Sequence, residues 1–341
     1  MNKNNFINLP AQNKINAFAE AAARKALPAV AIEKDWWVTA VLRALFSLPY
    51  AENLSFKGGT SLSKCYNLIE RFSEDIDIAV NREKPDLTKT PTRLRNDLRR
   101  STCKFVREEL QFDVAKALEN QGINSDLFSA NVNITPITTT DPEIVEIVYQ
   151  SLFEDNDYIK PVVKIEFSGR SMSEPLQTVK LQSILDEVFG DMSFTNPAFE
   201  ANAVVPERTF LEKIFLLHEE FAKPQELIRT ERMSRHLYDL ERIMNTETVE
   251  KALNDNKLYN SIVEHRRIFI GLGGFDYSTL APQTINILPP ESVITQWQQD
   301  YETMQKTMIY GKSLTFDKLL KRIEELQNKI RNAGESTKYG I

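Results

Sequence analysis

The pattern of hydrophobic residues changes at about residue 200, and this change constrains the fold more than any other feature of the sequence. Before it, segments with the two-residue period of strands alternate with segments that have the 3.6-residue period of helices. After it, almost every segment has the helical period. We therefore predict an α+β part followed by a helical part, with a boundary near residue 200.

The expected elements of the first part follow a simple order. Residues 10–27 and 28–48 each open with a proline suited to a first helical turn and continue with an amphipathic pattern. Then come a short strand ending in a glycine turn, a helix, a second strand, a long polar helix and three further strands. Their ranges are 54–59, 60–70, 74–80, 90–121, 129–137, 143–152 and 162–168. We expect the five strands to form one mixed sheet with flanking helices.

The rest of the chain is expected to be helical. Helices are predicted over 206–221, 231–244, 246–270, 291–309 and 316–331, with a break at Pro289 and Pro290 before the last two. A chain of 341 residues is long enough for about two domains. We predict a helical cap (1–50), a sheet core (51–200) and a C-terminal helical bundle domain (201–341).

Composition and charge argue against several classes of protein. Lys and Arg total 42 against 48 Asp and Glu, and the formal charge of −6 disfavours a protein that coats nucleic acid regardless of sequence. The two cysteines, Cys65 and Cys103, form neither a CxxC pair nor part of a cluster with zinc-ligand spacing. The sequence shows no signal-peptide pattern and no long apolar run. We expect a cytoplasmic protein without disulfides and without a membrane partner.

Two aspartates in one predicted strand are the first candidate for a chemical site. Asp75 and Asp77 are separated by one residue, so both side chains leave the same face of the strand. Neighbouring carboxylates repel each other unless a cation lies between them, and such hard oxygen ligands suit Mg²⁺ or Mn²⁺ better than zinc. The alternative is one aspartate solvated at the strand end and the other capping a turn.

A glycine turn precedes this acidic strand. Gly58 and Gly59 leave no side chain where the first strand turns into the helix that follows, and free backbone amides at Thr60 and Ser61 suit a phosphate group. The alternative is a plain turn next to two surface acids. A phosphate cradle beside a metal-binding carboxylate pair, within one short segment, favours chemistry on a nucleoside triphosphate.

Four motifs of the sequence resemble those of one enzyme family. They are GGTSLSK (58–64), RFSEDIDI (71–78), ERTFLEKIFLL (207–217) and RHLYDL (235–240), preceded by the run IEKDWWVTAVLRALF (32–46). With these motifs, the chain from about residue 32 to 240 resembles the nucleotidyltransferase toxins of the AbiEii/AbiGii group. That group belongs to the DNA polymerase β-like nucleotidyltransferase superfamily.

The resemblance implies what the enzyme does. An acceptor hydroxyl would attack the α-phosphorus of an NTP in line, and pyrophosphate would leave. In some similar members the acceptor is the 3′ end of tRNA. The protein would be the toxin of a toxin–antitoxin or phage-defence system, with an antitoxin protein encoded by an adjacent gene as its partner. Two other interpretations stay open: transfer to a small molecule or a protein, and a nucleotide-binding regulator without turnover.

The resemblance also implies roles for individual residues. The nucleotide would be held by Lys57, Gly58, Gly59, Thr60 and Ser73, and the divalent metals by Asp75, Asp77 and Glu166. Strand alternation places Glu166 on one face with Lys164, and the alternative is a solvent-facing strand residue. Lys213 would meet the triphosphate and Asp239 would complete the catalytic set. The alternatives are a solvated lysine and a structural pair between Asp239 and Arg235.

Basic residues gather in two places despite the negative net charge. The helix predicted over 90–121 brings several arginines onto one face through spacings of three and four residues. A second group lies around Asp239. Two interpretations remain open, a solvated surface or contact with the phosphate backbone of an RNA. The candidate RNA contacts are Arg93, Arg99, Arg100, Arg107 and Arg235.

Overall fold

The computed structural model describes residues 6–73, 75–81, 86, 88–134, 136–154, 159–172, 174–190 and 192–336, with side chains to residue 333. The chain divides into two compact units. The first consists of Met1–Cys65 and Ser73–Ala203, and the second of Tyr66–Phe72 and Val204–Ile341. The short segment 66–72 therefore belongs to the second unit, although both of its neighbours in the sequence belong to the first.

Two helices open the first unit, as the sequence predicts. Helix α1 (Ala11–Lys25) follows Pro10 and ends at Ala26, which adopts the left-handed conformation. Helix α2 (Ala29–Phe46) follows Pro28 and is buried along most of its length, including Trp36 and Trp37. Helix α1 packs against α2 and against the short helix α6 (Ile184–Phe189).

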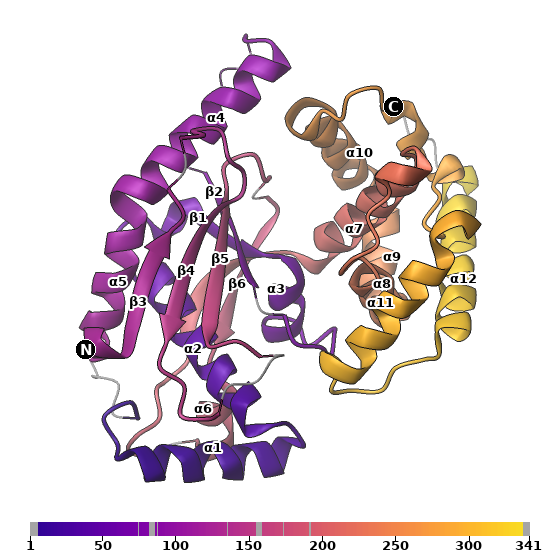
Figure 1. Cartoon of the computed structure of the whole chain (residues 1–341). Helices are drawn as coiled ribbons and strands as arrows, with labels where there is room; N and C mark the ends of the chain where they lie inside the picture. The colour runs from indigo at the N-terminus through magenta and orange to yellow at the C-terminus, as the bar shows by residue number, and fades with distance from the viewer. Residues whose placement is uncertain are drawn as a thin grey trace. The chain divides into compact units, whose positions relative to one another are not determined.

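A mixed sheet of seven strands forms the centre of the first unit (Figure 1), in the order β3-β4-β5-β2-β1-β7-β6. Strand β2 is antiparallel to β1 and parallel to β5. The bounds are β1 Leu54–Lys57, β2 Asp75–Val80, β3 Phe128–Val132, β4 Glu143–Tyr149, β5 Val162–Ser168, β6 Leu176–Leu181 and β7 Phe199–Val204. The five predicted strands are confirmed. Strands β6 and β7 were not predicted, because β6 is a largely exposed strand at the sheet edge with little hydrophobic pattern.

The predicted long helix is confirmed with one irregularity. Helix α4 (Pro91–Phe105) continues through a π-helical turn (Val106–Leu110) into α5 (Gln111–Asn120). Helix α5 runs beside β3 and packs against α2 (Figure 1). One face of strands β1, β2 and β5 is apolar and buried, with Phe56, Ile78 and Ile165 in its interior. This burial is the main hydrophobic core of the unit.

The helix after the glycine turn is shorter than predicted. Helix α3 (Gly58–Lys64) ends before Asn67, which adopts a positive φ of 52°. The prediction of a helix to residue 70 is therefore wrong, because the chain leaves the first unit here. In the second unit, the backbone N–H of Phe72 donates to the carbonyl of Met308 at 2.8 Å, and Arg71 forms an isolated bridge with Ile309.

The second unit is helical, as expected. Its helices are α7 Pro206–Phe221, α8 Arg235–Ile243, α9 Glu247–Asn254, α10 Asn256–His265, α11 Ile294–Thr307 and α12 Phe316–Ser336. The single helix predicted over 246–270 is wrong, because Asp255 interrupts it and caps α10 by accepting from the backbone N–H of Leu258 at 2.8 Å. Helix α10 then continues as a π-helical turn, Arg266–Ile270.

Short 3-10 turns complete the described structure. They are Ala51–Asn53, Ser125–Leu127, Gln225–Leu227, Tyr277–Leu280, Pro282–Thr284 and Glu291–Val293. No helix in the described ranges is both long and apolar enough to span a bilayer. The architecture is the predicted α+β class, with a mixed sheet flanked by helices and a helical C-terminal part.

Candidate functional site

Strand pairing brings two of the three predicted metal ligands next to each other. In the parallel pair β2–β5, Asp77 lies opposite Glu166, and Asp75 lies opposite Lys164. In the antiparallel pair β1–β2, Lys57 lies opposite Asp77. Residues that are directly paired in a ladder project from the same face of the sheet. Lys57, Asp77 and Glu166 therefore form a row across three adjacent strands, which we call the carboxylate row.

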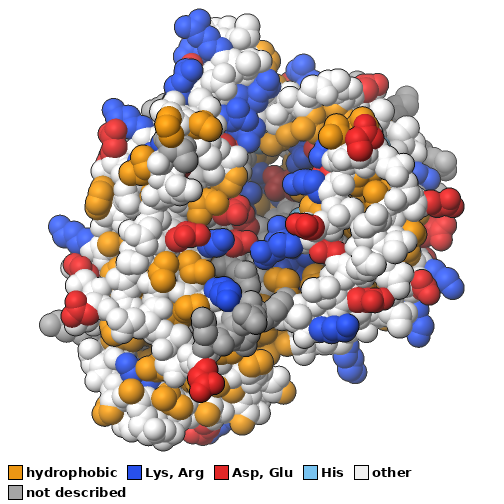
Figure 2. All heavy atoms as spheres, in the orientation of Figure 1, with side chains coloured by type: hydrophobic (Ala, Val, Ile, Leu, Met, Phe, Trp, Pro, Cys, Tyr) orange, Lys and Arg blue, Asp and Glu red, His pale blue; other side chains and the backbone are white. Residues whose placement is uncertain are grey.

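The carboxylate row lies on the face opposite the hydrophobic core. Asp75, Asp77 and Glu166 are half-buried, whereas the alternate residues Ile76 and Ile165 are completely buried. Over β4 and β5, the surface shows acidic side chains beside a basic one, with hydrophobic side chains around them (Figure 2). The amino group of Lys164 lies 3.5 Å from a carboxylate oxygen of Glu146 on this face. This face therefore carries charged groups beside hydrophobic ones.

The carboxylates fit a divalent metal by their chemistry. As the side chains are placed, no three His, Cys, Asp or Glu groups within the described ranges are close enough to share an ion. The backbone nonetheless directs three carboxylates, all hard oxygen donors, to one face. A Cβ added to Gly58 would lie 1.9 Å from Asp77 Oδ2, so the carboxylate of Asp77 already occupies the space that a side chain would need. Asp75, Asp77 and Glu166 thus remain our predicted metal ligands.

The glycine turn connects directly to the acidic strand. Gly58 adopts a φ of +80°, which favours glycine, at the junction between β1 and α3. The hydroxyl of Thr60 donates to the backbone carbonyl of Asp75 at 2.5 Å, and Ser61 donates to the carbonyl of Gly58 at 3.1 Å. Ser73 is half-buried two residues before Asp75. Because α3 has only seven residues, its dipole is modest. The feature of the turn that most favours a phosphate is its backbone, which is free of side chains.

Replacing Gly58 with Ala is expected to reduce activity far more than stability. The new methyl group would displace the Asp77 carboxylate, and the positive φ would add strain of about 1–2 kcal/mol. Gly190→Ala is the matched control, because Gly190 also has a positive φ, 56°, but a methyl group added there would meet no described atom within 4 Å. Comparing nucleotide incorporation and urea unfolding of both variants measures the two effects. Equal activity in the two variants would contradict a role for the Asp77 position.

Lys213 and Asp239 meet in the second unit in a buried cluster. Asp239 accepts from Arg71 Nε and from a terminal Arg71 nitrogen, each at 2.7 Å. Lys213 Nζ lies 2.9 Å from Oδ2 of the same carboxylate and 3.4 Å from His236 Nδ1. Arg71 and Asp239 are 2% and 0% exposed in their side chains. Asp239 therefore pairs with Arg71, an arginine that the sequence did not suggest as its partner.

The charges of this cluster are strongly coupled. Burial by itself would raise the pKa of Asp239, but the neighbouring charges of Arg71 and Lys213 outweigh it and hold that pKa well below its ordinary value. Burial lowers the pKa of Lys213, and Asp239 partly opposes that effect. Burial and the nearby Lys213 also lower the pKa of His236, so this imidazole is neutral at pH 7. Arg71 was not among the residues predicted from the sequence, although it opens the motif that contains the two aspartates.

The five candidate RNA contacts differ in their surroundings. Arg93 and Arg100 are exposed on α4, whereas Arg99 and Arg235 are half-buried. Arg107 forms a structural pair instead, since its Nε lies 2.8 Å from Glu143 Oε1 and the two side chains are 11% and 3% exposed. Arg107 therefore contributes to the contact between the π-helical turn and β4 rather than to the exposed basic face of the helix.

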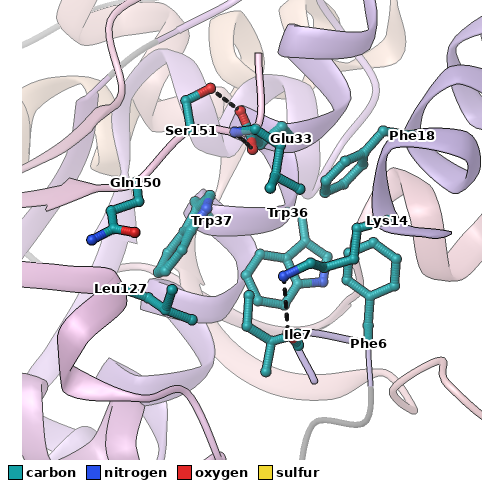
Figure 3. Close-up of a pocket in the computed structure, with 11 residues that line it drawn as sticks. Phe6, Ile7, Lys14, Phe18, Glu33, Trp36, Trp37, Leu127, Gln150 and Ser151 are labelled. Atoms are coloured by element: carbon teal, nitrogen blue, oxygen red, sulfur yellow. Dashed lines mark hydrogen bonds between the residues drawn. The ribbon is translucent and has the colours of Figure 1, made fainter. Parts of the chain in front are cut away.

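Two cavities lie in the first unit, away from the carboxylate row. One, of about 90 Å³, is walled by aromatic rings and flanked by Lys14 and Glu33 (Figure 3). Lys14 donates to the carbonyl of Ile7 at 3.1 Å, and burial lowers its pKa. The other, of about 540 Å³, lies between the end of α2 and α5. Neither is lined by a residue predicted for the site.

Comparison with known families identifies the chain. Residues 40–322 match the family model described as nucleotidyl transferase AbiEii toxin, Type IV TA system. The chain belongs to the AbiEii family. The resemblance seen in the sequence is thereby confirmed, and this AbiEii-family protein is a nucleotidyltransferase of the toxin–antitoxin type. No curated protein matches it.

Solved structures similar to this AbiEii-family chain come from two bacteria. MenT4, a nucleotidyltransferase toxin from Mycobacterium tuberculosis H37Rv, is 16% identical with a TM-score of 0.41, over 94% of this chain and 98% of that one. A putative nucleotidyltransferase from H. pylori is 14% identical with a TM-score of 0.46, over 92% and 100%. JHP933 from Helicobacter pylori is 13% identical with a TM-score of 0.43, over 87% and 90%. Because these TM-scores lie below 0.5, the assignment rests on the family model.

Proposed function

We propose that this AbiEii-family toxin transfers a nucleoside monophosphate from an NTP to the 3′ hydroxyl of an RNA, with tRNA as the acceptor, in a reaction that depends on Mg²⁺ or Mn²⁺. The observation that carries the proposal is the carboxylate row, in which Asp77 and Glu166 face each other across β2 and β5 beside the turn at Gly58. The acceptor oxygen forms a bond to the α-phosphorus, the bond to the β-phosphate breaks, and pyrophosphate leaves.

The residues of the chain would divide the work. Asp75, Asp77 and Glu166 hold the divalent ions, which supply Lewis-acid stabilisation of charge on the phosphates when bound. The glycine turn lets the triphosphate approach the backbone closely, with Lys57 in the same row as a positive charge. A carboxylate of the row would accept the proton of the attacking hydroxyl.

The cluster in the second unit supports the predicted role of Lys213. Arg71 and Lys213 both contact the carboxylate of Asp239, and the charges of Arg71 and Arg235 act on Lys213. Basic groups gathered in a buried environment favour a bound anion. Lys213 has three donor hydrogens, and Asp239 and His236 account for two partners of its amino group. A phosphate group is the anion that we propose for Lys213.

The exposed arginines of α4 supply the expected contact with the RNA backbone. Changing Arg93 and Arg100 together to Gln should weaken binding to every tRNA tested, whatever its sequence. It should also make the binding constant less dependent on salt concentration. If both arginines contact phosphates, the negative slope of log K against log[salt] should become smaller in magnitude by about 1.4–1.8. Fluorescence anisotropy between 50 and 300 mM salt measures it, with the exposed Arg24→Gln on α1 as the control. An unchanged slope would remove α4 from the RNA interface.

One incubation tests the acceptor. The purified protein is mixed with each α-labelled NTP, Mg²⁺ and total RNA, and the products are separated into RNA, protein and small molecules. We expect label in tRNA with one preferred NTP and growth arrest when the gene is expressed without its antitoxin. Label in protein or in small molecules would overturn the RNA acceptor. No label in any fraction would indicate a nucleotide-binding regulator.

A further inference from the structure

Three consecutive charged residues of α2, Glu33, Lys34 and Asp35, are largely shielded from solvent in a helix that is otherwise mostly apolar. Glu33 and Lys34 are 1% and 6% exposed, and the Asp35 side chain is 12% exposed. Successive residues of a helix point about 100° apart, so these side chains reach three different neighbours. Buried charges are costly unless each finds a partner, so their contacts explain why the helix tolerates them.

Glu33 and Lys34 hold the ends of two central strands. Glu33 accepts from the hydroxyl of Ser151 at 2.5 Å and from the backbone N–H of Leu152 at 2.8 Å, just beyond β4 (Figure 3). Lys34 donates to the carbonyl of Lys160 at 3.0 Å and to that of Val162, where β5 begins. The strand that carries Glu166 is thus fixed at its first residue by α2.

Asp35 joins two helices through its two oxygens. Its Oδ1 pairs with Lys64 Nζ at 2.5 Å, at the last residue of α3. Its Oδ2 accepts from the backbone N–H of Ile184 at 2.7 Å, at the first residue of α6. Helix α3 begins at Gly58, so the pair between Asp35 and Lys64 fixes the far end of the helix whose beginning is the glycine turn.

We propose that Glu33, Lys34 and Asp35 are positioning residues, with the pair Asp35–Lys64 setting the place of the glycine turn and Lys34 that of β5. Hydrogen bonds from these residues reach the far end of α3 and the strand ends. They act through α3 and β5, whose placement sets the distance between Gly58, Asp77 and Glu166. This inference rests on the proposed function, because it assigns a purpose to the placement of that site.

Asp35→Asn is the most selective test of this positioning role. Asn can still accept from the N–H of Ile184, but it removes the charge that holds Lys64. We expect the KM for the NTP to rise about tenfold or more with a smaller change in kcat, since misplacement of binding groups by about 1 Å costs up to 100-fold. Lys64→Met should have the same effect, and the double variant Asp35→Asn/Lys64→Met should be no worse than either single variant. Lys64→Arg keeps the positive charge and should retain most of the affinity for the NTP.

Asp186→Asn is the matched control. Asp186 is also a buried aspartate at the start of α6, but it accepts from Ser183 and from the backbone N–H of Asn196 rather than from α3. We expect this variant to lower stability without changing the KM for the NTP. Equal KM values for Asp35→Asn and Asp186→Asn would overturn the proposal.

Hydrogen exchange separates this proposal from the proposed function. In Asp35→Asn, the amides of residues 59–65 should exchange about tenfold faster or more, while those of Asp186→Asn in the same segment stay as in the parent protein. If the parent protein incorporates no nucleotide, the proposed function fails, and the exchange result still decides the positioning role. If the parent protein is active but the exchange of 59–65 is unchanged in Asp35→Asn, the positioning role fails by itself.

Discussion

Asp77→Asn and Asp75→Asn are each expected to reduce nucleotide incorporation by about 10³-fold or more. The amide cannot replace a carboxylate as a ligand of a divalent ion or as a proton acceptor, while its shape is nearly the same. Both residues are half-buried on the polar face of the sheet, so the free energy of unfolding should change by about 1 kcal/mol at most. Incorporation of labelled NTP and urea unfolding measure the two quantities on the same preparation.

Glu146→Gln is the control for these variants. Glu146 lies on the same face of the sheet, pairs with Lys164 at 3.5 Å and is 44% exposed in its side chain. Loss of this exposed pair should leave both activity and stability nearly unchanged. If Asp77→Asn kept more than a tenth of the parent activity, Asp77 would not be a metal ligand.

Asp239→Asn is expected to lower the free energy of unfolding by about 3–5 kcal/mol, because it leaves Arg71 and Lys213 buried without their counter-charge. The neutral amide would also present its NH₂ group to donors, where two oxygens now accept. Urea denaturation at pH 7 measures the loss. The exposed pair of Lys251 and Glu247 provides the control, and Glu247→Gln should cost about 1 kcal/mol or less.

The effect of Asp239→Asn should depend on pH in a defined direction. The folded-state pKa of Asp239 lies below the 3.8 of an unperturbed aspartate, so its ionised form is stabilised by folding. That stabilisation is fully present above about pH 4 and is lost as the pH falls through the folded pKa. The stability difference between the parent protein and the variant should therefore be constant from pH 7 to 5 and shrink below pH 4. A difference that grows on acidification would contradict the assigned charge state.

Regular hydrophobic patterns predicted the elements well where the alternation was strict or the helix start was marked. Strand β5 and helix α7 have the predicted bounds, because strict alternation and an initial proline mark them clearly. Strands β6 and β7 escaped detection, since β6 is mostly exposed and β7 carries a mixed run, FEANAV. The helix predicted over 246–270 failed because a single aspartate, Asp255, ends one helix and caps the next.

The candidate site could be predicted in type but not in its contacts. The alternation of side chains along each strand predicted which face Asp77 and Glu166 occupy. That they are neighbours follows only from the order of the strands in the sheet. The contact between Arg71 and Asp239 joins residues 168 positions apart in sequence, and no local period encodes it. Asp35 and Lys64 are likewise joined by the packing of α2 against the rest of the first unit. Motif resemblance located the chemistry, and the tertiary structure determined which charges are paired.

The position of the label in the NTP tests the central claim most directly. The protein is incubated with Mg²⁺ and RNA, once with the preferred NTP labelled at the α-phosphate and once with it labelled at the γ-phosphate. Nucleotidyl transfer at the carboxylate row predicts α-label in the RNA, γ-label in pyrophosphate, and neither product with Asp77→Asn. Label from the γ-phosphate in the RNA, or α-label transferred equally well by Asp77→Asn, would contradict it.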